Sequence, residues 1–259
     1  MTPYKKTILI CLLITLSSGI ALYALSNGVW GGIVSGIFTG AIMSVITTSV
    51  LYNVKKDEIF TNIGKELLST YWRLSYLYAQ LIKCANKLKG NEGAPNVIYK
   101  EIAGTYKVYE KYMENNNFDF ALNNYDGLLF SSLINKFFIS KEVKVLVNIR
   151  DMHQINKQYT LLCGDLSIMR LEFDLAEKSG NIEQINNIIM RIDTQYNYSL
   201  NTIPQQLAFI NYAMKNFEKI KKLNAPWNEM KQDILNRNGL FDNKINEAEY
   251  NFQPEYKRK

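Results

Sequence analysis

The stretch "GGIVSGIFTGAIMSVITT" at residues 31–48 carries a small residue at every fourth position of an otherwise apolar segment. With the glycine one step before it, the series comprises Gly28, Gly32, Gly36, Gly40, Ser44 and Thr48. Glycine costs about 1 kcal/mol relative to alanine in a helix surrounded by water, so a helical stripe of it needs a compensating interaction. In lipid, that interaction is the close packing of helix backbones, which small residues allow. We call these six residues the small-residue stripe and expect it to be a helix-packing or oligomerisation surface inside a membrane.

The apolar segment around the stripe is too long for one membrane crossing. No charged residue lies between Lys6 and Lys55. One helix through that run would be about 70 Å long, more than twice the thickness of the hydrocarbon core. The Ser-Asn-Gly sequence at 26–28 favours a turn, because Asn and Gly tolerate positive φ. We therefore expect residues 1–54 to form a transmembrane helical hairpin, with spans over about 7–25 and 29–51.

The charges that flank the two spans predict their orientation. Two lysines precede the first span and two follow the second, whereas the turn is uncharged; they are Lys5, Lys6, Lys55 and Lys56. By the positive-inside rule, both termini are then cytoplasmic. A cleaved signal peptide is the competing interpretation, because a basic start, an apolar core and the small residues Ala21 and Ala24 match one. Cleavage there would leave a mature chain that begins just before a second span, which favours the hairpin.

Two surfaces could meet the small-residue stripe, and the sequence leaves both open. One is the first span of the same chain, which has small residues of its own at Thr15, Ser18, Gly19 and Ala21. The other is the same stripe on a neighbouring copy, which the length of about five turns favours. The bulky residues beside the stripe are expected to face lipid; they are Ile33, Val34, Ile37, Phe38, Ile42 and Val45. Neither span contains Asp, Glu, Lys, Arg or His, so nothing indicates a proton relay, voltage sensor or charged selectivity ring.

The rest of the chain has helical periodicity almost throughout, and we expect residues 55–224 to form an elongated, antiparallel cytoplasmic helical bundle. No proline separates the second span from the first cytoplasmic helix. The two are therefore expected to form one long helix, which ends at the "GNEGAPN" stretch of residues 90–96. Its inward face is expected to carry Ile59, Ile63, Leu67, Tyr71, Leu74, Tyr78, Leu81, Ala85 and Leu88.

Four further helices are predicted before the tail, over about 97–115, 119–138, 141–178 and 182–217. The last of them is expected to kink near Pro204. Its expected inward face consists of Ile182, Ile185, Ile189, Ile192, Tyr196, Ile203, Leu207, Ile210, Met214 and Phe217. Residues 225–259 are expected to form a short helix and a flexible polar and basic tail. The predicted fold class is all-α.

The residue types that catalysis and metal binding require are scarce or scattered. The single histidine, His153, follows Asp151 by two positions, so the two lie on different faces of the expected helix. No zinc-like spacing occurs among the cysteines, which are Cys11, Cys84 and Cys163. An acidic cluster beside Lys178 is typical of a solvated helix face; it consists of Glu172, Asp174 and Glu177. Because phosphate-binding loops and nucleophile elbows are also missing, we expect no enzyme activity, no cofactor and no metal.

The formal net charge of +6 is concentrated in three basic clusters, at 55–56, 219–223 and 256–259. Attraction to the anionic inner leaflet explains the first cluster. Nucleic-acid binding is the alternative, with Tyr and Trp as stacking partners. Most of the aromatic residues fall on inward positions, however, and no motif for direct binding of RNA or DNA is present.

The two-span start, the glycine stripe and the helical domain of about 200 residues resemble the two-transmembrane effectors of bacterial anti-phage systems, notably those encoded with retron reverse transcriptases. This resemblance is one of layout and covers the whole chain. It implies a protein of the bacterial inner membrane that a partner complex holds inactive. In a retron, that complex would be the reverse transcriptase with its nucleic acid.

The expected function is therefore that of a membrane effector. Its second span would mediate homo-oligomerisation, and the assembly would permeabilise or depolarise the lipid bilayer when its regulator releases it. Two alternatives remain open: a constitutive membrane anchor or scaffold whose bundle recruits a cytoplasmic partner, and a small ion channel.

Overall fold

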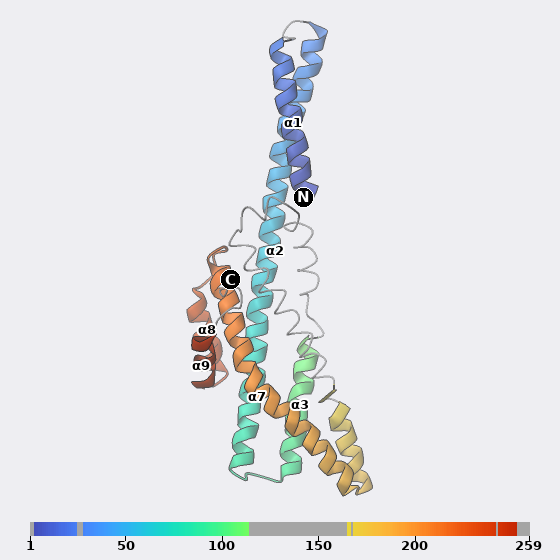
Figure 1. The fold of residues 1–259 in the computed structure, drawn as a ribbon, viewed down its shortest axis with the longest axis vertical. Helices are drawn as coiled ribbons and strands as arrows, with labels where there is room; N and C mark the ends of the chain where they lie inside the picture. Colours follow the sequence, from blue (N-terminus) through green and yellow to red (C-terminus); the bar gives the residue numbers. More distant parts are fainter. Residues whose placement is uncertain (1–2, 25–27, 114–164, 167, 242, 253–259) are drawn as a thin grey trace. The chain divides into compact units, whose positions relative to one another are not determined.

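A computed structural model describes residues 3–24, 28–113, 165–166, 168–241 and 243–252. These residues are helical almost throughout and include no β-strand, which confirms the all-α class for the described part of the chain. The helices are α1 (Pro3–Ala24), α2 (Val29–Lys89), α3 (Pro95–Met113), an unlabelled helix over 168–179, α7 (Ile182–Glu218), α8 (Trp227–Arg237) and α9 (Asn243–Asn251) (Figure 1). Several predictions fall outside these residues: the helix over 119–138, the first part of the helix over 141–178, and the residues Asp151, His153 and Cys163.

The chain divides into two compact units. Among the described residues, those up to Ile63 belong to the N-terminal unit and those from Gly64 onward belong to the second. We call the second the helical unit. Helix α2 contributes to both units and has 61 residues, which corresponds to about 90 Å at 1.5 Å per residue. The prediction that the second apolar segment continues into the following helix without a break is confirmed.

In the N-terminal unit, α1 and the first part of α2 are both apolar. Each is long and apolar enough to cross a membrane: α1 from Lys6 to Ala24, and α2 through a window near its start. Gly28 precedes α2 with φ of +105°, in the left-handed region that glycine adopts without strain. Its carbonyl accepts a hydrogen bond from the amide of Gly31 at 3.1 Å. The antiparallel transmembrane arrangement itself stays a prediction.

In the helical unit, α2 packs against α7 along the face that the sequence predicts. The Tyr196 hydroxyl of α7 donates to the Leu81 carbonyl of α2 at 2.9 Å. Farther along, the Phe217 ring lies over Gly64, where an added Cβ would be 2.9 Å from Phe217 Cε1. The buried apolar residues of α2 in this unit are Leu67, Tyr71, Leu74, Leu77, Tyr78, Ala79, Leu81 and Cys84.

Helix α3 and the helix over 168–179 are joined by ion pairs. The Lys100 ammonium lies 3.0 Å from Asp174 Oδ1, also pairs with Glu177, and sits 5.2 Å above the centroid of the Phe173 ring. Glu172 of the same acidic cluster pairs with Arg191 of α7 at 3.0 Å. The cluster interpreted as a solvated helix face therefore also links neighbouring helices.

Helix α7 differs from the expectation at its start. The expected inward residue Ile182 is 72% exposed, and Ile188 is buried in place of Ile189. The buried face continues from Ile188 to Ile192 and Tyr196 in steps of four. The expectation for Ile182 was wrong because the start of the helix packs against no neighbour there, whereas the expected inward residues Ile185 and Ile189 are half-buried. Pro204 is buried inside α7, and the helix continues past it to Glu218.

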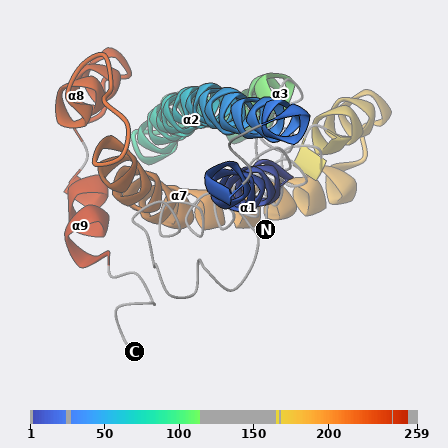
Figure 2. The ribbon, with the colours of Figure 1, turned by 90° about the horizontal axis from the view of Figure 1, so that it is seen from above.

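Two short helices complete the helical unit. Helix α8 matches the predicted short helix, and its Trp227 is fully buried. The sequence predicted flexible chain after it, but residues 243–251 form α9, which packs along α7 (Figures 1 and 2). Two apolar contacts hold this second helix in place. Ile245 is buried, and the Phe252 ring that follows the helix contacts the Phe209 ring of α7 with centroids 5.8 Å apart.

Candidate membrane-embedded surface

The N-terminal unit exposes most of the large apolar side chains of α1 and of the first part of α2. Leu16, Ile20 and Trp30 are 65%, 73% and 69% exposed. The other exposed ones up to residue 54 are Leu9, Ile10, Leu12, Leu13, Ile14, Tyr23, Val29, Ile33, Ile37, Met43, Ile46, Val50, Leu51 and Val54. Soluble monomers rarely expose contiguous apolar patches larger than a few hundred Å². Core helices of a soluble domain are mostly buried, whereas these two segments are not, so this surface fits a lipid environment.

Two aromatic residues mark one end of the apolar surface. Tyr23 lies near the end of α1 and Trp30 near the start of α2, and both side chains are exposed. Tyr and Trp are enriched where a membrane meets water, because their rings are apolar and carry one polar group. The sequence reasoning did not use these aromatics, although their position next to the turn was visible in it.

The face of α2 that is turned toward α1 carries bulky residues. Gly31 and Ala41 are buried, and Val34, Phe38 and Val45 are half-buried, at the three- and four-residue spacing of one helix face. A Cβ added to Gly19 of α1 would lie 3.4 Å from Cε2 of Phe38. The expectation that Phe38 faces lipid was therefore wrong, because its ring lies against Gly19 of α1. Val34, Ile42 and Val45 are half-buried.

The corresponding face of α1 is made mainly of small residues. Cys11, Thr15, Gly19 and Ala21 are half-buried, and Ser18 is buried. The Thr15 hydroxyl donates to the Cys11 carbonyl at 2.8 Å, and the Ser18 hydroxyl donates to the Ile14 carbonyl at 2.6 Å. These hydroxyls are satisfied within their own helix, which a lipid environment requires of polar groups.

The small-residue stripe of α2 points away from α1 over most of its length. Gly28, Gly32, Gly36, Gly40 and Ser44 are exposed, and Thr48 is half-buried. Gly36 and Gly40 each stand two positions from Phe38, which places them about 160° around the helix from it. Apart from the glycine itself, its two chain neighbours and the nearby backbone of α2, no described atom lies within 4 Å of a Cβ added at Gly32, Gly36 or Gly40. Of the two partners that the sequence left open, α1 of the same chain does not cover these glycines in the described structure.

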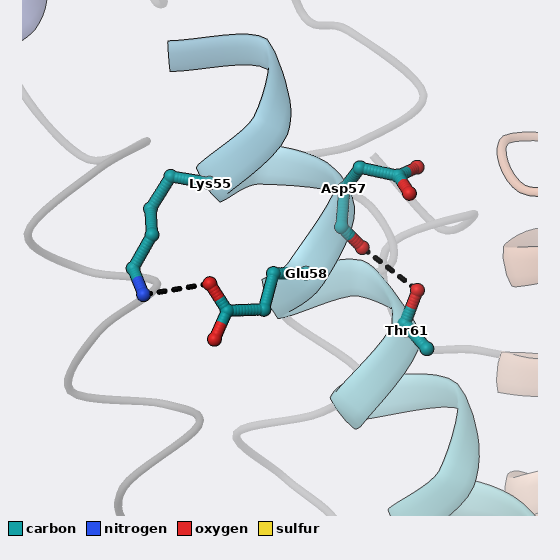
Figure 3. A network of polar contacts seen from close by, with 4 residues as sticks. All are labelled: Lys55, Asp57, Glu58 and Thr61. Atoms are coloured by element: carbon teal, nitrogen blue, oxygen red, sulfur yellow. Dashed lines mark hydrogen bonds and ion pairs between the residues drawn. The ribbon is translucent and has the colours of Figure 1, made fainter. Parts of the chain in front are cut away.

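Charged residues begin where the apolar surface ends. The Lys55 ammonium donates to Glu58 Oε2 at 2.7 Å, and the Thr61 hydroxyl donates to the Asp57 carbonyl at 2.8 Å (Figure 3). Lys56 lies 5.7 Å above the centroid of the Phe60 ring. Exposed ion pairs contribute about 0 to 1 kcal/mol to stability. The relevance of these lysines is therefore the positive charge that they place at the end of the apolar segment, and not a contribution to folding. Near the other end of the apolar segment, Lys6 is exposed and Lys5 belongs to α1.

Catalytic or metal-binding groupings do not emerge from the described residues. No group of three or more His, Cys, Asp or Glu side chains within them is placed to hold a metal ion. Cys11 and Cys84 are both free thiols, and burial raises the pKa of the Cys84 thiol. Burial also raises the pKa of the Glu66 carboxyl, against the opposing charge of Arg73.

The comparisons with known proteins returned no similarity. No family model matches the chain, and neither a curated protein nor a solved structure matches it significantly. The functional argument therefore rests on the residues and their geometry.

Proposed function

We propose that this chain is a non-enzymatic effector of the bacterial inner membrane that assembles through the second of its two spans and permeabilises or depolarises the bilayer. In this proposal, α1 and the first part of α2 form a transmembrane hairpin, and both termini are cytoplasmic. The helical unit docks a cytoplasmic regulatory complex that holds the effector inactive until infection. By analogy with retron-type systems, that complex is a reverse transcriptase with its nucleic acid.

The observation that carries this proposal is the outward position of the stripe. Contact between helices in lipid depends on close van der Waals packing, because lipid tails are as apolar as the side chains. The glycines of α1 and α2 play different parts: Gly19 accommodates Phe38 within the chain, whereas Gly32, Gly36 and Gly40 have open space beside them among the described residues. An open glycine face is well suited to a second copy of the same helix.

Polar side chains near the stripe support permeation by an assembly. Ser35, Thr39 and Thr47 are exposed on α2, and no charged residue accompanies them between Lys6 and Lys55. In a ring of copies, hydroxyls from such positions would meet water without imposing charge selectivity. The consequence for a cell would be loss of membrane potential.

A constitutive membrane anchor is the second candidate, and one surface of the helical unit favours it. A cavity of about 400 Å³ between α2 and α8 is lined mainly by apolar side chains, including Leu68, Trp72, Met230 and Ile234. Trp72 is 38% exposed there. A chain that recruits a partner protein to this groove would act as an anchor without permeabilising the membrane. A small channel that conducts without a trigger is the third candidate.

The test replaces two central glycines of the stripe with leucine. Gly36→Leu/Gly40→Leu should hold neighbouring helices several ångströms farther apart and remove their close packing. The added bulk raises the hydrophobicity of the span, so membrane insertion should persist. We expect the double variant to lose both the crosslinked oligomer and the membrane depolarisation that follows induced expression of the unaltered protein.

A matched control adds bulk beside the stripe. Ile37 and Ile46 are about half exposed. At 100° per residue, Ile37 lies about 100° from Gly36 and Ile46 about 160° from Ser44, so neither belongs to the stripe. Ile37→Phe/Ile46→Phe should therefore retain oligomer and depolarisation. If the glycine variant inserts normally and still depolarises, the stripe is not the working surface and the anchor becomes the better explanation. Conductance without any trigger would favour the channel.

A separate fusion tests the orientation of the spans. Alkaline phosphatase is active only outside the cytoplasm, so a fusion after Lys259 should be inactive when both termini are cytoplasmic. An active fusion at this position would contradict the two-span orientation and the function built on it.

A further inference from the structure

A cavity of about 470 Å³ lies in the helical unit, between α2, α3 and the helix over 168–179. Its lining includes Tyr76, Lys83 and Lys87 of α2, Glu101 and Gly104 of α3, and Arg170. Small-molecule sites are concave, with volumes of about 300 to 1,000 Å³ and a few convergent polar groups. This cavity has the size of such a site.

The charges in the cavity do not balance. The Lys87 ammonium donates to Glu101 Oε2 at 2.9 Å, so these two charges neutralise each other. Lys83 and Arg170 have no carboxylate within ion-pair distance among the described residues. The lining therefore presents two uncompensated positive charges, from two different helices, toward one space.

The absence of a side chain at Gly104 determines where the Arg170 guanidinium lies. A Cβ added to Gly104 would fall well inside contact distance of Arg170 Nη1, so the guanidinium rests directly on the backbone of α3. Glycine inside a helix costs about 1 kcal/mol relative to alanine. At this position, it lets Arg170 Nη1 approach the backbone of α3 end-on at the wall of the cavity.

We propose that this cavity binds a small phosphate-bearing molecule, up to about the size of a mononucleotide. The planar guanidinium of Arg170 supplies parallel N–H donors for two phosphate oxygens, and the Lys83 ammonium supplies a second charge. Tyr76 contributes an aromatic wall; its ring stacks on Trp72 with centroids 5.8 Å apart and an interplanar angle of 10°. This inference is independent of membrane permeation, since it concerns only the helical unit.

The primary experiment is a calorimetric titration of the full chain, in an uncharged detergent, with inorganic pyrophosphate. The unaltered protein should bind it, and the affinity should fall at high salt. Arg170→Gln and Lys83→Gln should each weaken binding roughly tenfold or more, as expected when one charge-assisted hydrogen bond is lost. Lys178→Gln is the matched control, because Lys178 is exposed on the same helix as Arg170 and does not line the cavity.

Gly104→Ala separates ligand binding from folding. The added methyl must displace the guanidinium, which is the far end of a flexible side chain, while alanine favours the helix. We expect weaker pyrophosphate binding with an unchanged or higher melting temperature. Unchanged affinity in Gly104→Ala would overturn the proposed placement of Arg170.

Two further titrations identify the source of the phosphate. ADP represents a soluble nucleotide, and glycerol 1-phosphate represents a lipid headgroup. Tighter binding of ADP would assign the cavity to nucleotides, and tighter binding of glycerol 1-phosphate would assign it to lipid headgroups; either ranking supports a phosphate site. The proposal is overturned if the unaltered protein binds none of the three probes, or if Lys178→Gln weakens binding as much as Arg170→Gln does.

Discussion

A buried hydrogen bond between α7 and α8 allows a quantitative test of how the C-terminal helices are held. The Trp227 indole donates from Nε1 to Asn211 Oδ1 at 2.9 Å, and both side chains are buried. The indole also contacts the Tyr71 ring of α2 edge-on, with centroids 5.2 Å apart and an interplanar angle of 87°. The bond therefore lies where α2, α7 and α8 meet.

The two partners can be removed singly and together. Asn211→Leu leaves the indole N–H buried without an acceptor, at a cost of about 1–3 kcal/mol in the free energy of unfolding. Trp227→Phe leaves the Asn211 amide unpaired and also shrinks the ring, for about 2–4 kcal/mol. The double variant leaves neither group unpaired. Its cost should therefore fall below the sum of the single costs by about 1–2 kcal/mol.

The assay is urea unfolding of the full chain in an uncharged detergent, followed by the circular dichroism of the helices. Trp30→Phe is the control, because Trp30 is exposed in the N-terminal unit and its replacement should leave the transition unchanged. If the two single costs add to within about 0.3–0.5 kcal/mol, Asn211 and Trp227 are not coupled. That outcome would refute the hydrogen bond as a determinant of α8 docking.

The remaining predictions concern the buried ion pair, alkaline stability and the long helix. Lys231 and Glu249 are mostly buried and pair at 2.7 Å. Glu249→Gln leaves the buried ammonium without its opposite charge, so the free energy of unfolding measured in urea should fall by about 3 kcal/mol. A fall below about 0.5 kcal/mol would contradict this. Burial, then a hydrogen bond to a carboxylate, raises the pKa of Tyr99 from 10.0 to about 12. Unfolded chains ionise this tyrosine first as the pH rises, so stability should fall between these two values, and Tyr99→Phe should flatten that fall in melts recorded across the range. Under the proposed function, a flexible Gly-Ser insertion after Val54 should leave membrane insertion intact and uncouple depolarisation from the proposed regulator; a fully regulated insertion variant would show that helix continuity is unnecessary.

The helices of the described chain could be predicted because their apolar residues recur at helical spacing. Leu67, Tyr71, Leu74 and Tyr78 lie on the buried face that the sequence predicts, and no breaker interrupts α2 before residue 90. The short α9 could not be predicted in the same way. It has one buried apolar residue, Ile245, so its formation depends on packing against α7 and not on a pattern of its own.

The orientation of the stripe could not be predicted for a different reason. Periodicity identifies a buried face only by contrast with polar residues, and the first part of α2 has apolar residues on every side. The side of α2 that faces α1 depends on a contact between the two helices, in which the Phe38 ring packs against Gly19. The cavity lined by Lys83, Gly104 and Arg170 could not be predicted either, because packing brings these residues together from segments far apart in the sequence.

The contact between Gly19 and Phe38 has a consequence for genetics. Alleles that enlarge residue 19 should lower the amount of protein in the membrane, because they disturb packing within each chain. Under the proposed function, alleles that enlarge residues 36 or 40 should leave abundance normal and abolish the growth arrest that depolarisation causes. A mutational scan scored for both abundance and growth would then divide the glycines of neighbouring helices into two phenotypic classes. Suppressors of the first class should arise at position 38, where a smaller side chain makes room within the same chain. Suppressors of the second class should instead change the stripe itself, which is present on every copy in the assembly.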